Sequence, residues 1–377
     1  MTRDRLLIIS YSPLRRDARV LRQIRLFAED YEVTTVGYGP APDGVADHVQ
    51  IPDEIIYWHK DRRLLAVRAY QRMYDRMPVT RFLRERLETG GHDIILANDV
   101  DTVPLAVTLS PRKGVHADLH EYSSRQLEER RAWRLVVAPF IRWMVRRWVT
   151  RADSVTTVGA GLAAEYAREF GVQAEVVMNA PHHRSDLAPT PVGEPLRLVH
   201  AGNGVATRLE VMLQAMDLIT SGATLDLYLI DQGDGYVPGL RRRYADHPAV
   251  RIHDAVPAGE VVPTLNGYDV GVYSLPPISF NFRWALPNKF FDFVQARLAV
   301  LIGPSPEMAA LVREHDLGAV AEDFTPEAFA AAVDAFTAEQ VAAAKEAADA
   351  AAAVLCAEQQ VAGWAEPIAA LAARARR

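Results

Sequence analysis

The sequence predicts an α/β protein with two doubly wound domains, each built on a parallel sheet, that face each other across a cleft. Apolar runs of strand length alternate with helix-period segments along nearly the whole chain, a pattern typical of βαβ units. A chain of 377 residues exceeds one ordinary core, so two domains are expected. A Pro-rich polar segment at 181–195 interrupts the alternation, which then restarts.

We expect an N-terminal domain over 1–180, a linker over 181–195, a C-terminal domain over 196–356 and a final helix over 357–377. Strands of the first domain are predicted near Leu6–Ser10, Val33–Val36, Ile94–Ala97, Val115–Leu119, Val155–Val158 and Glu175–Met178. Its helices are predicted at Ala18–Ala28, Leu64–Met77, Thr80–Glu88 and Ser124–Thr150. Strands of the second domain are predicted near Leu196–His200, Leu225–Ile230, Val250–His253, Val270–Tyr273, Ala299–Ile302 and Ala319–Ala321.

The composition indicates a globular protein of a reducing compartment. Its single cysteine, Cys356, excludes an intramolecular disulfide and fits the cytosol. The apolar run at the N-terminus is too short for a signal peptide, and no run approaches the roughly 18 apolar residues of a membrane span. We therefore expect a cytoplasmic location.

The segment from Leu286 to Ile302 carries the most specific chemistry. It predicts a helix that opens at Pro287, followed by a buried strand. Lys289 and Asp292 are three residues apart and share a helix face. A helix N-terminus with a lysine attracts phosphate, and a nearby carboxylate can bind a ribose diol. Together they suit a nucleotide diphosphate; the alternative is an amphipathic surface helix with a chance pair.

Polar residues also follow two strands of the first domain. Asp99 and Asp101 form an Asp-x-Asp pair that could hold a metal, but we favour a helix cap or a polar contact with substrate. His120, with Asp118 and Glu121 beside it, lies where a strand meets the cleft. There a neutral imidazole could contact a sugar hydroxyl, with Glu121 orienting it or an acceptor.

The second domain opens with a strand, a glycine turn and a helix. Gly202, Asn203 and Gly204 form the turn, which suits phosphate at a helix start and nearly matches the dinucleotide pattern, with Thr207 in the place of the third glycine. Arg208 could neutralise a phosphate or could be a solvated helix residue.

Positive charge is concentrated in the first domain. Residues 55–151 contain 19 Lys/Arg against 11 Asp/Glu, and 125–151 alone hold eight arginines and three tryptophans. With the arginine-rich 60–86, this region suits an anionic lipid surface; the alternative is a core-facing helix with snorkelling arginines. Nucleic acid is not expected as a partner, because the sequence contains neither an aromatic–basic RNA motif nor zinc-finger spacing.

These segments together resemble the retaining glycosyltransferases of the two-domain GT-B fold, in particular family 4 (glycosyl transferases group 1). The resemblance spans essentially the whole chain. It rests on Ser10-Tyr-Ser with Asp17 and Arg19, on Asn98–Thr102, on Asp118-Leu-His120-Glu121, on Val177–Pro181 and on Leu286–Ile302.

The resemblance implies two Rossmann-like domains, the first for the acceptor and the second for a nucleotide-sugar donor, with a C-terminal helix that crosses back to the first. It implies that His120 contacts the donor sugar, that Asp292 binds ribose and that Lys289 or Arg208 neutralises the diphosphate. It implies no metal and no cofactor beyond the donor. We predict a catalytic group of His120, Glu121 and Asp99, and a donor-binding group of Gly202, Asn203, Arg208, Asn288, Lys289, Asp292, Ser305 and Glu307.

The chain departs from the family pattern at two positions. Trp284 stands where the family commonly has the first of two glutamates, and Asn203 where it usually has an arginine. The main hypothesis is sugar transfer from a nucleotide diphosphate to an unknown hydroxyl acceptor, which could be lipid-linked, with retained configuration, in cell-surface glycan synthesis. The alternatives are a nucleotide-sugar epimerase of related fold and a non-catalytic sugar-nucleotide-binding partner subunit.

Overall fold

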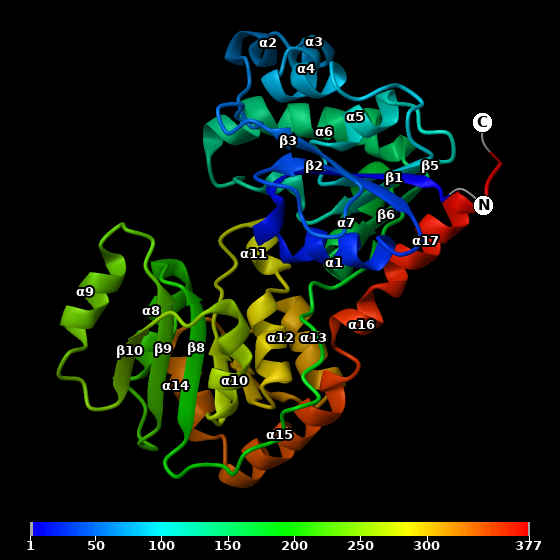
Figure 1. The fold of residues 1–377 in the computed structure, drawn as a ribbon. Helices are drawn as coiled ribbons and strands as arrows, with labels where there is room; N and C mark the ends of the chain where they lie inside the picture. The colour runs from blue at the N-terminus through cyan, green and yellow to red at the C-terminus, as the bar shows by residue number, and fades with distance from the viewer. Residues whose placement is uncertain (1–2, 376–377) are drawn as a thin grey trace. The chain divides into compact units, whose positions relative to one another are not determined.

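The computed structural model describes residues 3–375 and divides the chain into two compact units (Figure 1). Unit 1 contains the chain up to Met178, the short segment Ser279–Asn281 and the chain from Gln360 onward. Unit 2 contains Asn179–Ile278 and Phe282–Gln359. Each unit is an α/β structure on a wholly parallel sheet, so the predicted fold class is confirmed.

The sheet of unit 1 has seven strands in the order β3-β2-β1-β4-β5-β6-β7. The order reverses between β1 and β4, and in such sheets ligands bind beyond the carboxyl ends of the strands at this switch point. Leu6 of β1 pairs in register with Val33 of β2 and with Ile94 of β4. The strands are β1 Arg5–Pro13, β2 Glu32–Tyr38, β3 Asp47–Ile51, β4 Ile94–Asn98, β5 Gly114–Leu119, β6 Ser154–Thr157 and β7 Glu175–Val176.

Helices of unit 1 flank this sheet, and one of them comes from the far end of the sequence. Trp364, Ile368 and Leu371 of α17 are buried in the same apolar cluster as Leu6 and Ile8 of β1. The helices are α1 Ala18–Phe27, α2 Arg62–Ala66, α3 Tyr70–Asp75, α4 Pro78–Arg84, α5 Val103–Thr108, α6 Ala138–Arg147, α7 Ala160–Phe170 and α17 Ala362–Ala372. Short 3-10 turns are η1 Leu14–Arg16, η2 Ser123–Arg125 and η4 Val149–Arg151, and η3 Trp133–Val137 is a π-helical turn.

Unit 2 repeats the plan with six strands in the order β10-β9-β8-β11-β12-β13, so its switch point lies between β8 and β11. The strands are β8 Arg197–Asn203, β9 Thr224–Ile230, β10 Val250–Asp254, β11 Val270–Tyr273, β12 Ala299–Ile302 and β13 Gly318–Val320. The helices are α8 Ala206–Ala215, α9 Tyr236–Arg243, α10 Val261–Asn266, α12 Asn288–Gln295, α13 Pro306–Glu314, α14 Pro326–Asp334 and α15 Ala338–Ala352, with a 3-10 turn η5 at Ala258–Glu260. The short helices α11 Phe280–Arg283 and α16 Ala357–Gln360 lie where the chain passes between units.

Two helices expected from periodicity are shorter in the structure. In the predicted helix over 124–150, residues 126–130 form turns, and helical structure runs without a break from 131 to 147 through η3 and α6. Pro139, in the first turn of α6, has no N–H to donate, and the π-helical turn η3 directly precedes α6. The predicted helix over 64–77 is wrong, because Arg68 has a left-handed φ of 54° and separates α2 from α3.

Strand β3 is absent from the sequence prediction. Its residues, DHVQI, contain only two apolar side chains, and it pairs on one side only, with β2. An edge strand of this kind shows little hydrophobic alternation. In the described part of the chain, no helix is long and apolar enough to span a membrane.

Candidate functional site

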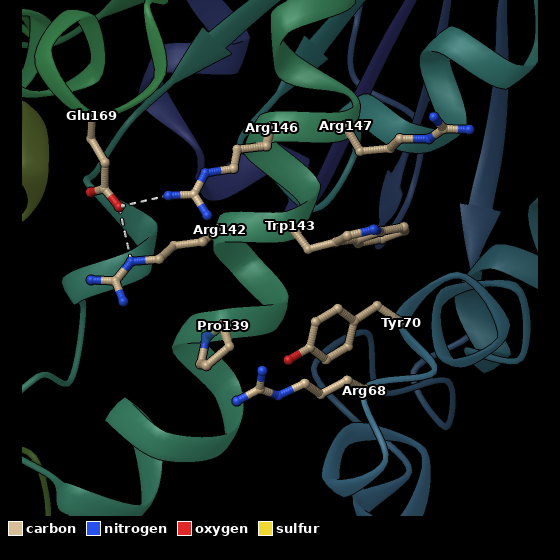
Figure 2. Close-up of a pocket in the computed structure, with 8 residues that line it drawn as sticks. All are labelled: Arg68, Tyr70, Pro139, Arg142, Trp143, Arg146, Arg147 and Glu169. Carbon is tan, nitrogen blue, oxygen red and sulfur yellow. Dashed lines mark ion pairs between the residues drawn. The ribbon is translucent and has the colours of Figure 1, made fainter.

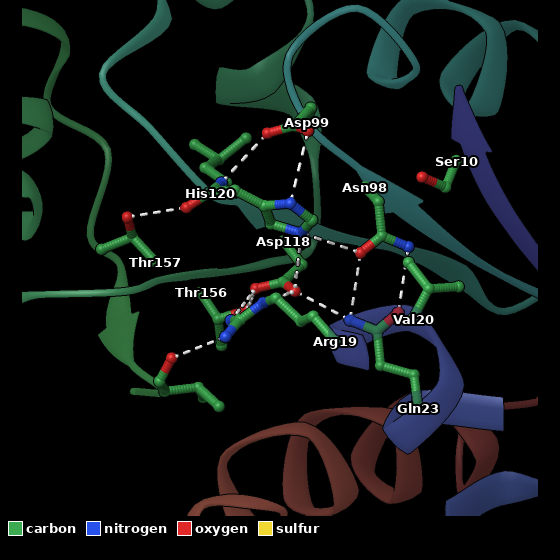
Figure 3. Close-up of polar contacts among 12 residues, drawn as sticks. Ser10, Arg19, Val20, Gln23, Asn98, Asp99, Asp118, His120, Thr156 and Thr157 are labelled. Atoms are coloured by element: carbon green, nitrogen blue, oxygen red, sulfur yellow. Dashed lines mark hydrogen bonds and ion pairs between the residues drawn. The ribbon is translucent and has the colours of Figure 1, made fainter. Parts of the chain in front are cut away.

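Asp118 is the centre of a buried polar network at the end of β5 (Figure 3). The Arg19 guanidinium donates two hydrogen bonds to its carboxylate, each of 2.7 Å. Gln23 Nε2 and Thr156 Oγ1 each donate another of 2.7 Å. Burial alone would raise the pKa of Asp118, but the Arg19 charge and the hydrogen bonds from His120 and Arg19 hold that pKa well below its ordinary value. Asp118 is therefore a fixed anion.

Helix α1 supplies two of the donors to Asp118, and the start of this helix fixes their position. Asp17 caps the helix, accepting from the backbone N–H groups of Arg19 and Val20. Arg19 and Gln23 follow at a spacing of four, which places them on one helix face. Both side chains are buried, and Arg19 also donates to the carbonyl oxygen of Val177 at 2.9 Å.

His120 is held between three acceptors. Its Nε2 lies 3.1 Å from Asn98 Oδ1 and 3.4 Å from Asp118 Oδ2, and its Nδ1 lies 3.4 Å from Asp99 Oδ2. Burial would lower the pKa of the imidazole, but the Asp99 charge and the bond to Asp118 raise it above its ordinary value. The structure therefore brings His120 and Asp99 together, with the imidazole fixed at the carboxyl end of β5.

The helix-cap interpretation of Asp99 and Asp101 is wrong. Thr102 is the N-cap residue of α5, and no side-chain cap bond is present there. Asp99 instead adopts a left-handed φ of 66° and accepts a hydrogen bond of 3.1 Å from the His120 backbone N–H. Burial raises the pKa of Asp101, and its Oδ1 has no hydrogen-bond partner among the described residues. Asp99 is thus engaged with His120 and not with the helix, whereas Asp101 has one oxygen without a hydrogen-bond partner among the described residues.

A cavity of about 1430 Å³ opens at this point, lined by residues of unit 1. Asp99, Asp101, His120 and Glu121 line it, together with Ser10, Tyr11 and Ser12 near the carboxyl end of β1. It therefore lies at the switch point of the first sheet, where ligands bind in such folds.

In unit 2, the turn after β8 brings two predicted residues into contact. Gly202 has a φ of 158°, and a Cβ atom there would lie 2.0 Å from Lys289 Cε. The Lys289 side chain therefore crosses the end of β8 at the switch point of the second sheet. Asn203 is the last residue of β8, and the next glycine, Gly204, packs against Val237.

Lys289, Arg208 and Asp292 form a charged group at this edge. Burial, and then the Arg208 charge, lower the pKa of Lys289, so the two cations repel each other. Burial raises the pKa of Asp292 to about 6, against the opposing effect of Lys289. Within the described part of the chain, the Lys289 ammonium has no hydrogen bond or ion pair, and Arg208 Nε is buried without a partner. An anion would satisfy both.

Hydroxyl groups complete this edge of unit 2. Ser274 follows β11, and Ser305 begins α13; both side chains are buried and neither Oγ has a hydrogen-bond partner among the described residues. Ser305 is an N-cap residue whose side chain makes no cap bond. Of the other predicted donor residues, Asn288 is exposed at the first position of α12, and Glu307 lies in the first turn of α13.

Sequence reasoning missed Gln23, Thr156 and Ser274. Gln23 carried a usable signal, since a polar residue four positions after Arg19 continues the buried face of α1. Thr156 and Ser274 carried none, because single hydroxyl residues in or after buried strands are common.

A separate surface of unit 1 is basic (Figure 2). A shallow pocket of about 580 Å³ is lined by Arg68, Tyr70, Pro139, Arg142, Trp143, Arg146, Arg147 and Glu169. Glu169 lies 3.0 Å from Arg142 Nε and 3.9 Å from Arg146 Nη2, so one carboxylate faces two of the four guanidinium groups.

No model of a protein family matches the sequence, and no curated protein gives a significant match. Solved structures do match. HepE from Anabaena, crystallised in complex with UDP and glucose, has a TM-score of 0.71 at 10% identity over 97% of this chain and 100% of that chain. The fold is that of the GT-B glycosyltransferases.

Two further GT-B structures agree. Sucrose-phosphate synthase from Thermosynechococcus elongatus has a TM-score of 0.68 at 11% identity, covering 98% of this chain and all of its own. WaaG, a glycosyltransferase involved in lipopolysaccharide biosynthesis, has a TM-score of 0.61 at 12% identity, covering 96% of this chain and 98% of that one. At these sequence identities the similarity establishes the GT-B fold and does not establish the activity, which has to be argued from the residues of the site.

Proposed function

We propose that this protein transfers a sugar from a nucleotide diphosphate, with UDP as the first candidate nucleotide, to a hydroxyl acceptor with retained configuration. The observation that carries the proposal is the unsatisfied cationic edge of unit 2. There Lys289 and Arg208 lie near each other at a sheet switch point, with Asp292 as a neighbouring carboxylate, and Arg208 Nε is buried without a hydrogen-bond partner among the described residues. The complex of HepE with UDP and glucose supports the choice of nucleotide.

Each residue of this edge has a role in the proposal. Lys289 and Arg208 neutralise the diphosphate as it leaves, which is the largest electrostatic demand of the reaction. Ser305 and Ser274 donate to phosphate oxygens, with Ser305, Pro306 and Glu307 forming the first turn of a helix whose N-terminus favours anions. Asp292 accepts from the ribose hydroxyls. No metal is needed in this scheme, because two cationic side chains supply the neutralising charge.

In unit 1, His120 contacts the donor sugar and Asp99 and Asp118 fix its ring. Bond cleavage at the anomeric carbon transfers the electron pair to the diphosphate. The acceptor oxygen forms the new bond on the same face, and its proton passes to a diphosphate oxygen. Binding both substrates in contact supplies much of the rate enhancement.

The proposal is tested by a thermal-shift screen of nucleotide diphosphates and their sugars, followed by donor-hydrolysis assays. Ligand binding to the folded state raises the melting temperature by mass action. We expect UDP or another nucleoside diphosphate to stabilise the protein and Lys289→Ala to abolish most of that shift. The proposal fails if no nucleotide sugar is bound or turned over.

The same assays separate the alternatives. An epimerase converts the donor without an acceptor, whereas a transferase needs one beyond slow hydrolysis. A non-catalytic partner subunit binds the nucleotide without turnover, an outcome that Trp284, in place of the family's usual glutamate, makes worth testing.

We also propose that unit 1 docks on an anionic membrane surface, at the cytoplasmic face, during cell-surface glycan synthesis. The support is the basic surface of Arg68, Arg142, Arg146 and Arg147, with Val67 and Leu135 exposed nearby in sequence (Figure 2). Flotation with vesicles containing phosphatidylglycerol should capture the protein, and should fail with neutral vesicles or at high salt. Equal recovery from both vesicle types would reject electrostatic docking.

A further inference from the structure

The cavity of unit 1 is lined by two chemically different sets of side chains. One set consists of the carboxylates of Asp99, Asp101 and Glu121 together with His120. The other comes from two walls, 56–66 and 132–141, and its apolar and aromatic members are Ile56, Tyr57, Trp58, Leu65, Trp133, Val136, Val137 and Ile141. The wall from 56–66 also contributes His59, Lys60, Asp61 and Arg62.

The wall from 132–141 contains the π-helical turn η3, a geometry that occurs often at functional sites. Trp133, Val136 and Val137 of this turn line the cavity, whereas Arg134 and Leu135 do not. The indole Nε1 of Trp133 is buried and has no hydrogen-bond partner among the described residues. Asp101 Oδ1, which belongs to the lining of the same cavity, also lacks a hydrogen-bond partner among the described residues. The cavity lining thus contains an unused donor and an unused acceptor.

The wall from 56–66 contains an aromatic cluster. Tyr57 packs against Tyr11 at 5.6 Å and against Trp58 at 5.0 Å between ring centroids. Trp58 is 62% exposed although it lies beside these rings and lines the cavity. A ligand in the cavity would cover this exposed indole surface.

We propose that the acceptor is amphiphilic: a hydroxyl group lies at His120, and an apolar body packs on Trp58 and Trp133, which line the same cavity. This inference rests on the proposed glycosyl transfer and specifies its acceptor class. Ligand pockets usually measure roughly 300–1,000 Å³, and this one, at about 1430 Å³, exceeds the need of a single monosaccharide. The apolar body is that of a lipid-linked glycan or of an aromatic small molecule.

The test measures binding to the intact protein without donor, by isothermal titration calorimetry. Three probes share the same sugar hydroxyls: methyl β-glucoside, octyl β-glucoside below its micelle concentration and 4-nitrophenyl β-glucoside. We expect at least tenfold tighter binding of an apolar probe than of methyl β-glucoside. Preference for the octyl chain indicates a lipid-linked acceptor, and preference for the nitrophenyl ring indicates an aromatic one.

Single substitutions test where the apolar probe binds. Trp58→Ala and Trp133→Ala should each weaken binding of the apolar probe at least fivefold. Leu218→Ala and Val354→Ala are controls, since these apolar side chains are 45% and 54% exposed and do not line the cavity. Equal binding of all three probes, or equal losses in the controls, overturns the inference.

The rise in melting temperature caused by UDP, measured on the same samples, distinguishes failure of the donor proposal from failure of the acceptor proposal. A normal UDP shift with no apolar preference rejects the acceptor class alone. Apolar binding without any nucleotide shift rejects the donor proposal instead.

Discussion

The Lys289 side chain crosses the backbone of Gly202, so a Cβ at position 202 would come within 2.0 Å of Lys289 Cε. Gly202→Ala should therefore displace the ammonium from the proposed diphosphate site. The φ of 158° adds strain for any residue with a Cβ. We expect the UDP-induced rise in melting temperature to fall, corresponding to at least tenfold weaker binding.

Gly239→Ala is the control for this substitution. A Cβ at Gly239 meets no heavy atom within 4 Å, and the residue lies inside α9, where alanine favours the helix. This variant should keep the full UDP shift and a melting temperature equal to or above that of the parent. If Gly202→Ala binds UDP as the parent does, Lys289 is not a diphosphate ligand.

Asp292→Asn should raise the free energy of unfolding and weaken binding of the nucleotide-sugar donor. The pKa of the carboxyl is raised from 3.8 to about 6, so the folded state favours the neutral form. The free energy of unfolding then falls as the pH rises from about 4 to about 6 and levels off above that. Asparagine removes this cost, which is about 3 kcal/mol at pH 7.5 and less at pH 4.5. Urea unfolding at both pH values measures the change in stability, and UDP titrations of the same variant measure the change in binding.

An exposed carboxylate of the same unit provides the comparison. Asp246→Asn should change stability little at either pH, because the side chain is exposed. A loss of stability in Asp292→Asn at pH 7.5 would show that this carboxylate is stabilised rather than strained in the folded protein.

Asp118→Asn should destabilise unit 1 severely. It leaves the buried Arg19 guanidinium without its anion, and breaking such a pair costs about 3–5 kcal/mol. Because the folded pKa of Asp118 is lowered, its contribution is present above its unfolded pKa and is lost as the pH falls through the folded pKa. The difference between parent and variant should shrink in acid.

The exposed pair of Asp75 and Arg84 tests whether burial is the cause. These side chains are 37% and 36% exposed, so Asp75→Asn should cost under about 1 kcal/mol. Similar losses in the two variants would contradict the argument.

His120→Asn should reduce sugar transfer without affecting nucleotide binding. The imidazole lies in unit 1, whereas the proposed diphosphate ligands lie in unit 2. Removing a positioned group of this kind typically costs roughly 10²–10⁴ in rate. Transfer assays should show that loss while the UDP thermal shift stays at the parental value; a near-parental transfer rate would remove His120 from the reaction.

The sequence predicts the sheets well because their central strands are continuous apolar runs buried on both faces. Leu298–Ile302 and Leu6–Ile9 are of this kind. It fails at β3, an edge strand with little apolar content, and at Arg68, whose left-handed φ separates α2 from α3 within a predicted helix. Hydrophobic periodicity shows which side chains face the core and does not detect a change in backbone conformation.

The candidate site was predictable where residues follow strands in sequence. His120, Asp99 and Gly202 were found because carboxyl ends of parallel strands collect ligand-binding groups. The helix-cap interpretation of Asp99 is wrong, since its backbone has a left-handed φ and its carboxylate accepts a hydrogen bond from the His120 N–H. That conformation depends on the neighbouring strand β5, which local sequence cannot supply.

The core of unit 1 has a consequence for how the protein is made. Trp364, Ile368 and Leu371 of α17 fill the same cluster as Leu6, Ile8 and Ile24. During translation β1 and α1 leave the ribosome long before α17 is synthesised. The apolar face of the first sheet that α17 covers is therefore exposed in the nascent chain. A chaperone that shields this face during synthesis should therefore raise the yield of folded protein.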